Sequence, residues 1–325
     1  MRRLSLIIEY LKLCRFSSLG TIGIITTTGA VCTIGTIFHP TVLMLFLLGL
    51  FIGAISMVMN ELCDLEIDKM VHGQHKPLVS GDISVKNGYM FLSILIAIGF
   101  LLGTYINYTN IGVLVLCFIV GTLYNLCSKK SPLATGFLSI WLFTLILYSA
   151  TCISMSVPLI VWILAIYAAI DVILITCATG DLKDIQTDSI NSAKVMGCRV
   201  DNGVLHLSNK YVVIFLGIHI SELYLLAWST QFFIFNIYIE VLLMILMAAY
   251  VGLHLGQTVY YNHAPYRRER MCKYATLMAF ASLVLVSVFL IAIIGIEILI
   301  LPLVAICWFL ISNRVLFKRF SRGNW

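Results

Sequence analysis

Long apolar runs alternate with short polar segments along most of the chain. A helix needs roughly 20 apolar residues to cross the hydrocarbon core of a bilayer, and several runs reach that length. The runs are continuous and do not alternate residue by residue, which argues against a transmembrane barrel. We therefore predict an all-α, polytopic helical membrane protein, with spans near residues 16–38, 41–59, 88–106, 111–126, 133–153, 159–179, 211–229, 233–254, 274–294 and 298–311. If the last two runs are instead one broken element followed by an interfacial helix, nine spans remain.

Basic residues occur only in alternate connections between these runs. All 21 Lys and Arg residues fall in segments 1–15, 60–87, 127–132, 180–210, 255–273 and 312–325. The opposite connections, "HP", "NYTN", "SMSVP", "STQ" and "GIE", contain none. Because positive charge collects on the cytoplasmic side, we predict that both termini and all the long polar loops are cytoplasmic. Part of this charge, such as "YRRER" at residues 266–270, is expected to lie against anionic headgroups.

Composition supports a single membrane domain over residues 1–325. Charged residues make up 11% of the chain, against about 25% in soluble proteins. The ten cysteines are scattered without a CxxC pair, which indicates small buried side chains rather than metal ligands or disulfides. The basic, amphipathic start "MRRLSLIIEYLKLCRF" has no small-residue cleavage site, so no cleaved signal peptide is expected. We expect the lipid bilayer, and no nucleic acid, as its surroundings.

An acidic cluster, "NELCDLEIDKM", follows the second run. Asn60, Asp64 and Asp68 are spaced i, i+4, i+8 and so share one face of a helix. On the same helix, Glu61 and Glu66 are predicted to point elsewhere.

A second cluster, "GDLKDIQTD", follows the sixth run about 120 residues later. Asp181, Asp184 and Asp188 are spaced i, i+3, i+7 and are predicted to share a helical face, with Lys183 on the far side. Carboxylates this close repel one another unless a cation lies between them. Mg²⁺ suits such ligands, because it takes one or two carboxylates and completes its shell with phosphate oxygens and water. Each cluster alone could be a solvated loop, but two on one side favour a functional site.

A bound diphosphate also needs cationic partners, and each candidate here could equally be a topology anchor. Tyr124 could orient a diphosphate or anchor the chain at the interface. The candidate cations are Arg15, Lys76, Lys129, Lys130 and Lys194.

Asp171 lies within the sixth predicted span, where a carboxylate is costly and usually functional. It could contact an acceptor in a cavity, pair with a Ser or Thr hydroxyl, or remain protonated. For Glu222 and His254, which also lie in apolar runs, we expect polar packing.

Together these motifs resemble the UbiA superfamily of intramembrane prenyltransferases over about residues 10–295. The first cluster matches the family's NxxxDxxxD motif, and the second is similar to its DxxDxxxD motif through Asp184 and Asp188. "HKPLVSGDIS" and "LYNLCSKK" resemble the family's segments after the second and fourth spans, and Arg15 and Lys194 match its basic positions. Gly180, where many members have Asn, the segment "SINSAKVMG" and a tenth span depart from the pattern.

The resemblance implies a nine-helix bundle around a central cavity, here extended by a tenth span. It implies a Mg²⁺-dependent transfer from a prenyl diphosphate to a small aromatic or lipid acceptor, with release of diphosphate. The implied catalytic carboxylates are Asp64, Asp68, Asp184 and Asp188, and the metal ligands are these with Asn60 and Asp181. A cyclase that uses the same diphosphate site remains an alternative. A transporter is a further alternative, although transporter carboxylates lie near the bilayer midplane rather than at span ends.

Overall fold

The computed structural model describes residues 2–71, 76–128, 130–188 and 190–317. Within these residues, ten helical segments are long and apolar enough to cross a membrane, which confirms the ten predicted spans. Their main helices are α2 (Phe16–Ile34), α3 (Pro40–Cys63), α6 (Val85–Ile106), α7 (Ile111–Cys127), α8 (Ala134–Thr151), α9 (Leu159–Ile173), α12 (Asn209–Ser229), α13 (Ile237–Tyr261), α14 (Arg268–Ile294) and α15 (Ile300–Phe317). Some predicted ends differ from the observed ends by several residues. The eighth span, for example, was predicted to end at residue 254, but α13 continues to Tyr261.

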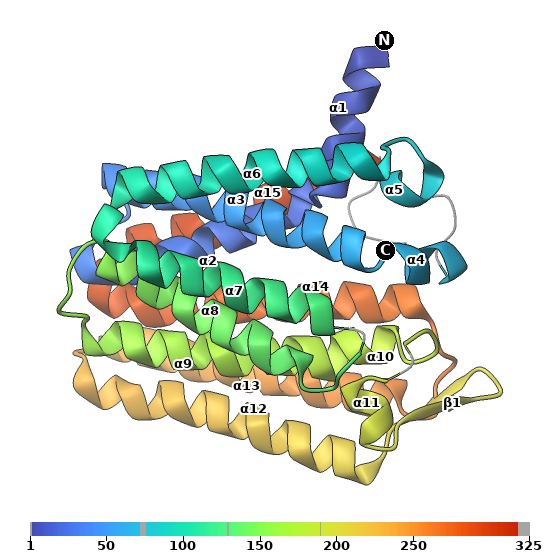
Figure 1. The fold of residues 1–325 in the computed structure, drawn as a ribbon. Helices are drawn as coiled ribbons and strands as arrows, with labels where there is room; N and C mark the ends of the chain where they lie inside the picture. The colour runs from blue at the N-terminus through green and yellow to red at the C-terminus, as the bar shows by residue number, and fades with distance from the viewer. Residues whose placement is uncertain (1, 72–75, 129, 189, 318–325) are drawn as a thin grey trace.

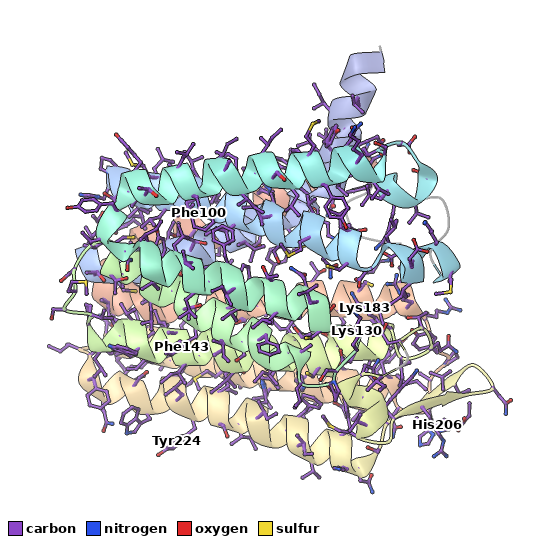
Figure 2. The ribbon with its side chains drawn as sticks, viewed as in Figure 1. Phe100, Lys130, Phe143, Lys183, His206 and Tyr224 are labelled. Atoms are coloured by element: carbon purple, nitrogen blue, oxygen red, sulfur yellow. The ribbon has the colours of Figure 1, made fainter. Side chains whose placement is uncertain are left out.

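The long helices lie side by side in one bundle (Figure 1). α2 packs against α3 and α8, α8 against α7 and α9, and α13 against α14, while α15 covers α2. The short helices α4 (Leu65–Val71), α5 (Pro77–Ser80), α10 (Asp181–Lys183) and α11 (Ser192–Val195) gather at one end of the bundle, where α1 (Arg2–Leu13) also lies. Figure 2 shows Lys130, Lys183 and His206 toward this end, whereas Phe100, Phe143 and Tyr224 lie along the body of the bundle. We call this end the loop end.

Small residues let α2 approach both of its neighbours closely. A Cβ atom at Gly29 would lie 2.1 Å from the carbonyl oxygen of Ile146 on α8. A Cβ atom at Gly49 on α3 would lie 2.5 Å from Thr26 Oγ1. Without a hydrophobic driving force between helices in lipid, this close packing is a main source of association. The α2–α3–α8 contact therefore forms a rigid frame for the loop end.

Both helices that carry the acidic clusters change their geometry at the loop end. α3 ends at Cys63, and Asp64 (φ −90°, ψ −2°) separates it from α4. The backbone N–H of Asp64 still donates to Asn60, and that of Asp68 to Asp64, both at 2.9 Å, so the predicted four-residue spacing persists.

The second cluster differs from the prediction of one continuous helical face. α9 continues as a π-helix, η3 (Leu174–Gly180), and the short α10 ends at Lys183. Asp184 (φ −110°, ψ 13°) is not helical, and a turn in which Asp188 N–H donates to the Asp184 carbonyl follows it.

A β-hairpin at the loop end was absent from the sequence prediction. Strands β1 (Arg199–Asp201) and β2 (Val204–His206) pair antiparallel across a two-residue turn. Asn202 (φ 50°) and Gly203 (φ 76°) both have positive φ, as a tight hairpin turn requires. Leu205 exchanges backbone hydrogen bonds with His263 and Ala264, at 2.8 and 2.9 Å. The hairpin thereby fixes the segment that leads into α14.

Candidate functional site

The two acidic clusters face a common cavity of about 160 Å³ at the loop end. Six predicted ligands line it together with residues of α7, α8, η3, α10 and α14 and residues just before α2 and α5. The charged and amide residues of its wall are Arg15, Asn60, Asp64, Asp68, Lys76, Asp181, Lys183, Asp184, Asp188 and Arg268, and Tyr124 also lines it. The structure thus brings together residues that are more than 100 positions apart in the chain.

An ion-pair network forms the wall on the side of α3. Glu61 accepts from Arg15 Nη2 at 2.5 Å and from Arg15 Nε at 3.0 Å. Lys76 Nζ bridges Glu61 (2.9 Å) and Asp68 (2.6 Å). Burial lowers the pKa of Arg15, but the Glu61 carboxylate more than offsets it and holds that pKa above its usual value. Arg15 also has φ 48°, a rare backbone conformation for a residue other than glycine, at the turn between α1 and α2.

Glu61 is not among the residues that line the described cavity, but it contacts two that are. Its side chain is only 4% exposed and holds two of the predicted cations. Glu66, by contrast, is 80% exposed and pairs with Lys69, as the helical spacing predicts. The sequence did not show these contacts, because Arg15, just before α2, and Lys76, just before α5, supply charges to a second face of α3.

Arg268, at the start of α14, completes the opposite wall and was not among the predicted site residues. Its Nε and Nη2 donate to Asp184 Oδ1 at 3.0 and 2.9 Å. Lys183 also lines the cavity, with Nζ 3.6 Å from Asp184 Oδ2, so its predicted place on the far side is wrong. α10 ends at Lys183, which removes the helical phase that the prediction assumed.

Tyr266 connects this wall to the hairpin. Its N–H donates to the Gly203 carbonyl at 2.8 Å, and its hydroxyl donates to the Lys183 carbonyl. Burial, with the Asp184 carboxylate, raises the pKa of Tyr266 to about 12, so the hydroxyl keeps its proton. The hairpin therefore helps to hold Arg268 beside Asp184.

The remaining predicted residues differ in how they relate to the cavity. Asp181 lines the cavity and accepts from the Ser192 backbone N–H at 2.9 Å. Lys194 donates to the Asp188 carbonyl, and so ties the loop rather than lining the cavity as described. Lys130 is exposed and is not part of the described cavity wall. The predicted cation Lys129 lies outside the described residues.

The carboxylates do not form a preformed metal cage. Over residues 2–71, 76–128, 130–188 and 190–317, no three His, Cys, Asp or Glu side chains lie close enough to hold a metal alone. Cations occupy two of the carboxylates, since Lys76 contacts Asp68 and Arg268 contacts Asp184. This arrangement fits Mg²⁺ that arrives with a phosphate ligand, because Mg²⁺ needs only one or two carboxylates per ion.

A second, mostly apolar cavity of about 180 Å³ lies further along the bundle. It is lined from α2, α8, α9, η3 and α14, and Ile175 of η3 faces it while Thr176 lines the acidic cavity. Asp171 lines the apolar cavity and accepts from Tyr250 Oη and Ser282 Oγ, each at 2.8 Å. Two expectations for Asp171 therefore hold together, since it faces a cavity and pairs with a hydroxyl.

Comparison with solved structures shows the same fold in UbiA homologues. A structure of digeranylgeranylglyceryl phosphate synthase has TM-score 0.66 and 18% identity, covering 90% of this chain and all of that chain. A UbiA homologue from Archaeoglobus fulgidus, bound to DMAPP and Mg²⁺, has TM-score 0.61 and 16% identity, covering 86% and 99%. An apo UbiA homologue from Aeropyrum pernix K1 has TM-score 0.64 and 14% identity, covering 83% and 97%.

No curated protein matches the chain in sequence. A family model, however, matches residues 22–259, and this range includes both acidic clusters. That model describes the UbiA prenyltransferase family, and the match covers well over half of the chain. Together with ten helices that can cross a membrane, this makes the protein an integral, multi-pass intramembrane prenyltransferase. The chain belongs to the UbiA prenyltransferase family.

Proposed function

We propose that this protein transfers the prenyl group of a prenyl diphosphate to a small aromatic or lipid acceptor and releases diphosphate. The observation that carries the proposal is the pair of adjoining cavities. The acidic cavity offers carboxylates and cations to a diphosphate, and the apolar cavity offers a dry site to an isoprenoid tail. Ile175 and Thr176, consecutive residues of η3, line one cavity each, so a single ligand with a charged head and an apolar tail suits both.

Mg²⁺ belongs to this proposal because the carboxylates fit it and because the Archaeoglobus fulgidus homologue was solved with DMAPP and Mg²⁺. The residues that would hold it are Asn60, Asp64, Asp68, Asp181, Asp184 and Asp188. When bound, Mg²⁺ neutralises the negative charge that develops on a leaving diphosphate.

The chain's own cations bind and orient the diphosphate. Lys76 and Arg268 lie on opposite walls of the acidic cavity, each against a carboxylate that a metal would engage. Arg15 lies between Asn60 and Glu61, and its guanidinium also faces the cavity. Such fixed charges stabilise the diphosphate as the allylic C–O bond breaks and the electron pair leaves with oxygen.

The apolar cavity protects the allylic cation from water, which would otherwise trap it. Its wall is mainly aliphatic, with Tyr167, Asp171 and Ser282 as a polar patch. The acceptor forms the new bond to the prenyl carbon and loses a proton. This polar patch is the place where we expect the acceptor to be recognised.

The test uses purified protein in detergent with labelled geranylgeranyl diphosphate, Mg²⁺ and a panel of acceptors that includes hydroxybenzoate and a glycerophosphate lipid. Asp64→Ala and Asp184→Ala should each abolish product, while Glu66→Ala, a matched acidic residue outside the cavity wall, should retain it. Unchanged turnover in both aspartate variants would refute the site. Cyclised product without any acceptor would indicate the cyclase, and uptake into vesicles without release of diphosphate would indicate a transporter.

We further propose that both termini and the acidic cavity face the cytoplasm. The distribution of all Lys and Arg residues on alternate connections supports this orientation.

A further inference from the structure

A second group of ionisable side chains is buried inside the bundle, apart from the acidic cavity. His219 and Glu222 on α12 are 0% exposed, and His254 on α13 is buried as well. They lie between α9 and the pair α12–α13, in segments that cross the membrane. None of them lines the acidic cavity as the structure describes it, so the site derived above does not use them.

These side chains form a continuous series that starts at the apolar cavity. The Glu222 carboxyl lies beside Asp171 and Tyr167, which both line that cavity. His219 Nδ1 is 3.3 Å from Glu222 Oε2. The rings of His219 and His254 are stacked, with centroids 4.8 Å apart and an interplanar angle of 19°.

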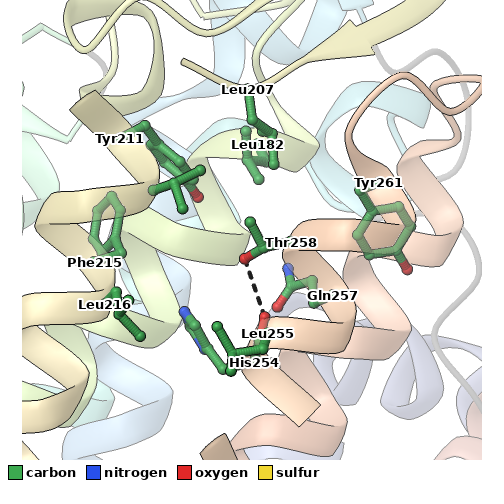
Figure 3. Close-up of a pocket in the computed structure, with 11 residues that line it drawn as sticks. Leu182, Leu207, Tyr211, Phe215, Leu216, His254, Leu255, Gln257, Thr258 and Tyr261 are labelled. Atoms are coloured by element: carbon green, nitrogen blue, oxygen red, sulfur yellow. Dashed lines mark hydrogen bonds between the residues drawn. The ribbon is translucent and has the colours of Figure 1, made fainter. Parts of the chain in front are cut away.

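The series ends at a small pocket between α12 and α13 (Figure 3). Figure 3 shows His254 at one end of the pocket, Leu182 and Leu207 at the other, and Gln257 and Thr258 between them. Its volume of about 10 Å³ is close to the space that one water molecule needs. Leu207 directly follows β2 of the hairpin and lies two residues before α12, so the far end of the pocket lies at the loop end.

Polar packing alone does not account for this group. Among the described residues, His219 Nε2, His254 Nδ1 and the side-chain amide of Gln257 lack a hydrogen-bond partner. Unpaired buried polar atoms are rare in proteins, since each has lost its hydrogen bonds to water without gaining others. Chains of Asp, Glu and His inside membrane proteins commonly serve as proton relays. The free lone pairs and N–H groups are what such a relay requires.

We propose that Asp171, Glu222, His219 and His254 form a proton path from the apolar cavity to the pocket between α12 and α13. The path rests on the proposed function, which requires the acceptor to lose one proton inside a dry cavity. When the acceptor bonds to the prenyl carbon, the electron pair of its broken O–H or C–H bond stays with the acceptor. The proton passes to Asp171 and then through Glu222 to His219. Because the rings of His219 and His254 are stacked, one of them has to turn before His254 receives the proton and passes it to a water molecule. Each step moves one proton and no further electrons, and Asp171 returns to its starting state.

The direct test does not need substrate. Detergent-solubilised protein is transferred into D₂O, and infrared spectroscopy follows the exchange of the protons on the carboxyl groups of Asp171 and Glu222. Asp171→Asn and Glu222→Gln identify the band by removing it. His254→Phe should slow its exchange by about tenfold or more, because the path to the pocket is interrupted. His254→Gln, which keeps a polar side chain, should slow it less.

Asn313→Leu is the matched control, because Asn313 on α15 is also buried with both side-chain polar atoms unpaired in the described structure but lies outside the path. It should leave exchange unchanged. Equal exchange rates in His254→Phe and wild type would overturn the proposal, as would the absence of a carboxyl band assignable to Asp171 or Glu222.

A second measurement uses turnover with an acceptor that the wild-type protein converts. Glu222→Gln and His254→Phe should lower kcat about tenfold or more, leave KM for the prenyl diphosphate unchanged and increase the solvent deuterium isotope effect on kcat. An unchanged kcat and isotope effect would overturn the path. If the wild type converts no acceptor, the proposed function fails, whereas the exchange experiment still decides whether the proton path exists.

Discussion

Glu61 offers a sharp test of how the acidic cavity is held together. The substitution Glu61→Gln keeps the shape of the side chain but removes its charge. In the structure this carboxylate contacts Arg15 at 2.5 Å and Lys76 at 2.9 Å, and Lys76 is only 7% exposed. The variant would therefore leave two cations beside a neutral amide, although Lys76 would keep its contact with Asp68.

The expected loss of stability follows from the two contacts. Two unit charges about 4 Å apart interact by about 4 kcal/mol at an effective dielectric constant of about 20. Removing one partner of a buried pair typically costs about 3–5 kcal/mol. Because the Gln carbonyl still accepts one hydrogen bond and Lys76 retains Asp68, we expect the lower end, about 3 kcal/mol. For a chain of this size, that corresponds to a fall in the unfolding midpoint of roughly 4–5 °C.

The assay is thermal unfolding in detergent at fixed ionic strength, with Glu66→Gln as the control. Glu66 pairs with Lys69 at the surface, where an ion pair contributes about 0–1 kcal/mol. The double variant Arg15→Met, Glu61→Gln should lose less stability than the two single variants lose in total. In the double variant, Arg15 and Glu61 are both neutral, so neither substitution leaves the charge of the other residue unpaired. A midpoint for Glu61→Gln equal to that of the control would refute the reasoning.

Three further predictions concern the site. Arg268→Met should lower kcat/KM for the prenyl diphosphate about 10- to 100-fold in initial-rate assays, since a hydrogen bond to a charged group contributes about 1.5–3 kcal/mol. Arg268→Lys should lower kcat/KM less, and an unchanged kcat/KM in Arg268→Met would show that Arg268 does not bind the diphosphate. Chelation by EDTA should abolish turnover and Mg²⁺ should restore it, because the opposed carboxylates need a cation between them; turnover in excess EDTA would contradict this. With Cys63 and Cys307 replaced by Ser, an impermeant maleimide should label Met155→Cys on intact cells and Asp82→Cys only after permeabilisation; the reverse pattern would invert the proposed orientation.

The membrane spans could be predicted from the sequence because lipid imposes one requirement on every span. Each segment must satisfy its own backbone hydrogen bonds, so it forms a helix, and it must expose apolar side chains to lipid. Together these requirements produce a continuous apolar run of helix length in the sequence. The ends were less predictable, as at α13, which continues through polar residues such as Gln257 to Tyr261. Those residues face a pocket rather than lipid, and nothing local in the sequence distinguishes the two.

The acidic cavity was predictable only as far as helical spacing reaches. Asn60, Asp64 and Asp68 keep that spacing through the break after α3, and all three line the cavity. Glu61 and Arg268 were missed because their roles depend on partners from elements distant in the sequence. The spacing of residues along one helix carries no information about such partners.

The hairpin had a local signal that the prediction did not use. Asp201, Asn202 and Gly203 form the "DNG" turn sequence, and Asn-Gly favours the two-residue turn that the structure contains. The hairpin in turn places the segment before Arg268, so this turn was the one available clue to the missing cation.

The π-helical segment Leu174–Gly180 sets a limit on how the gene can change. A π-turn holds about one residue more than an α-turn, and each α-helical residue advances the helix by about 100°. Deleting one residue here would let the segment close into an ordinary α-helix with little rotation of the second aspartate cluster, whereas deleting one residue from α9 itself would rotate that cluster by about 100°. A single-codon deletion should therefore cost less activity in this segment than in α9, and a deletion scan across both would show the difference.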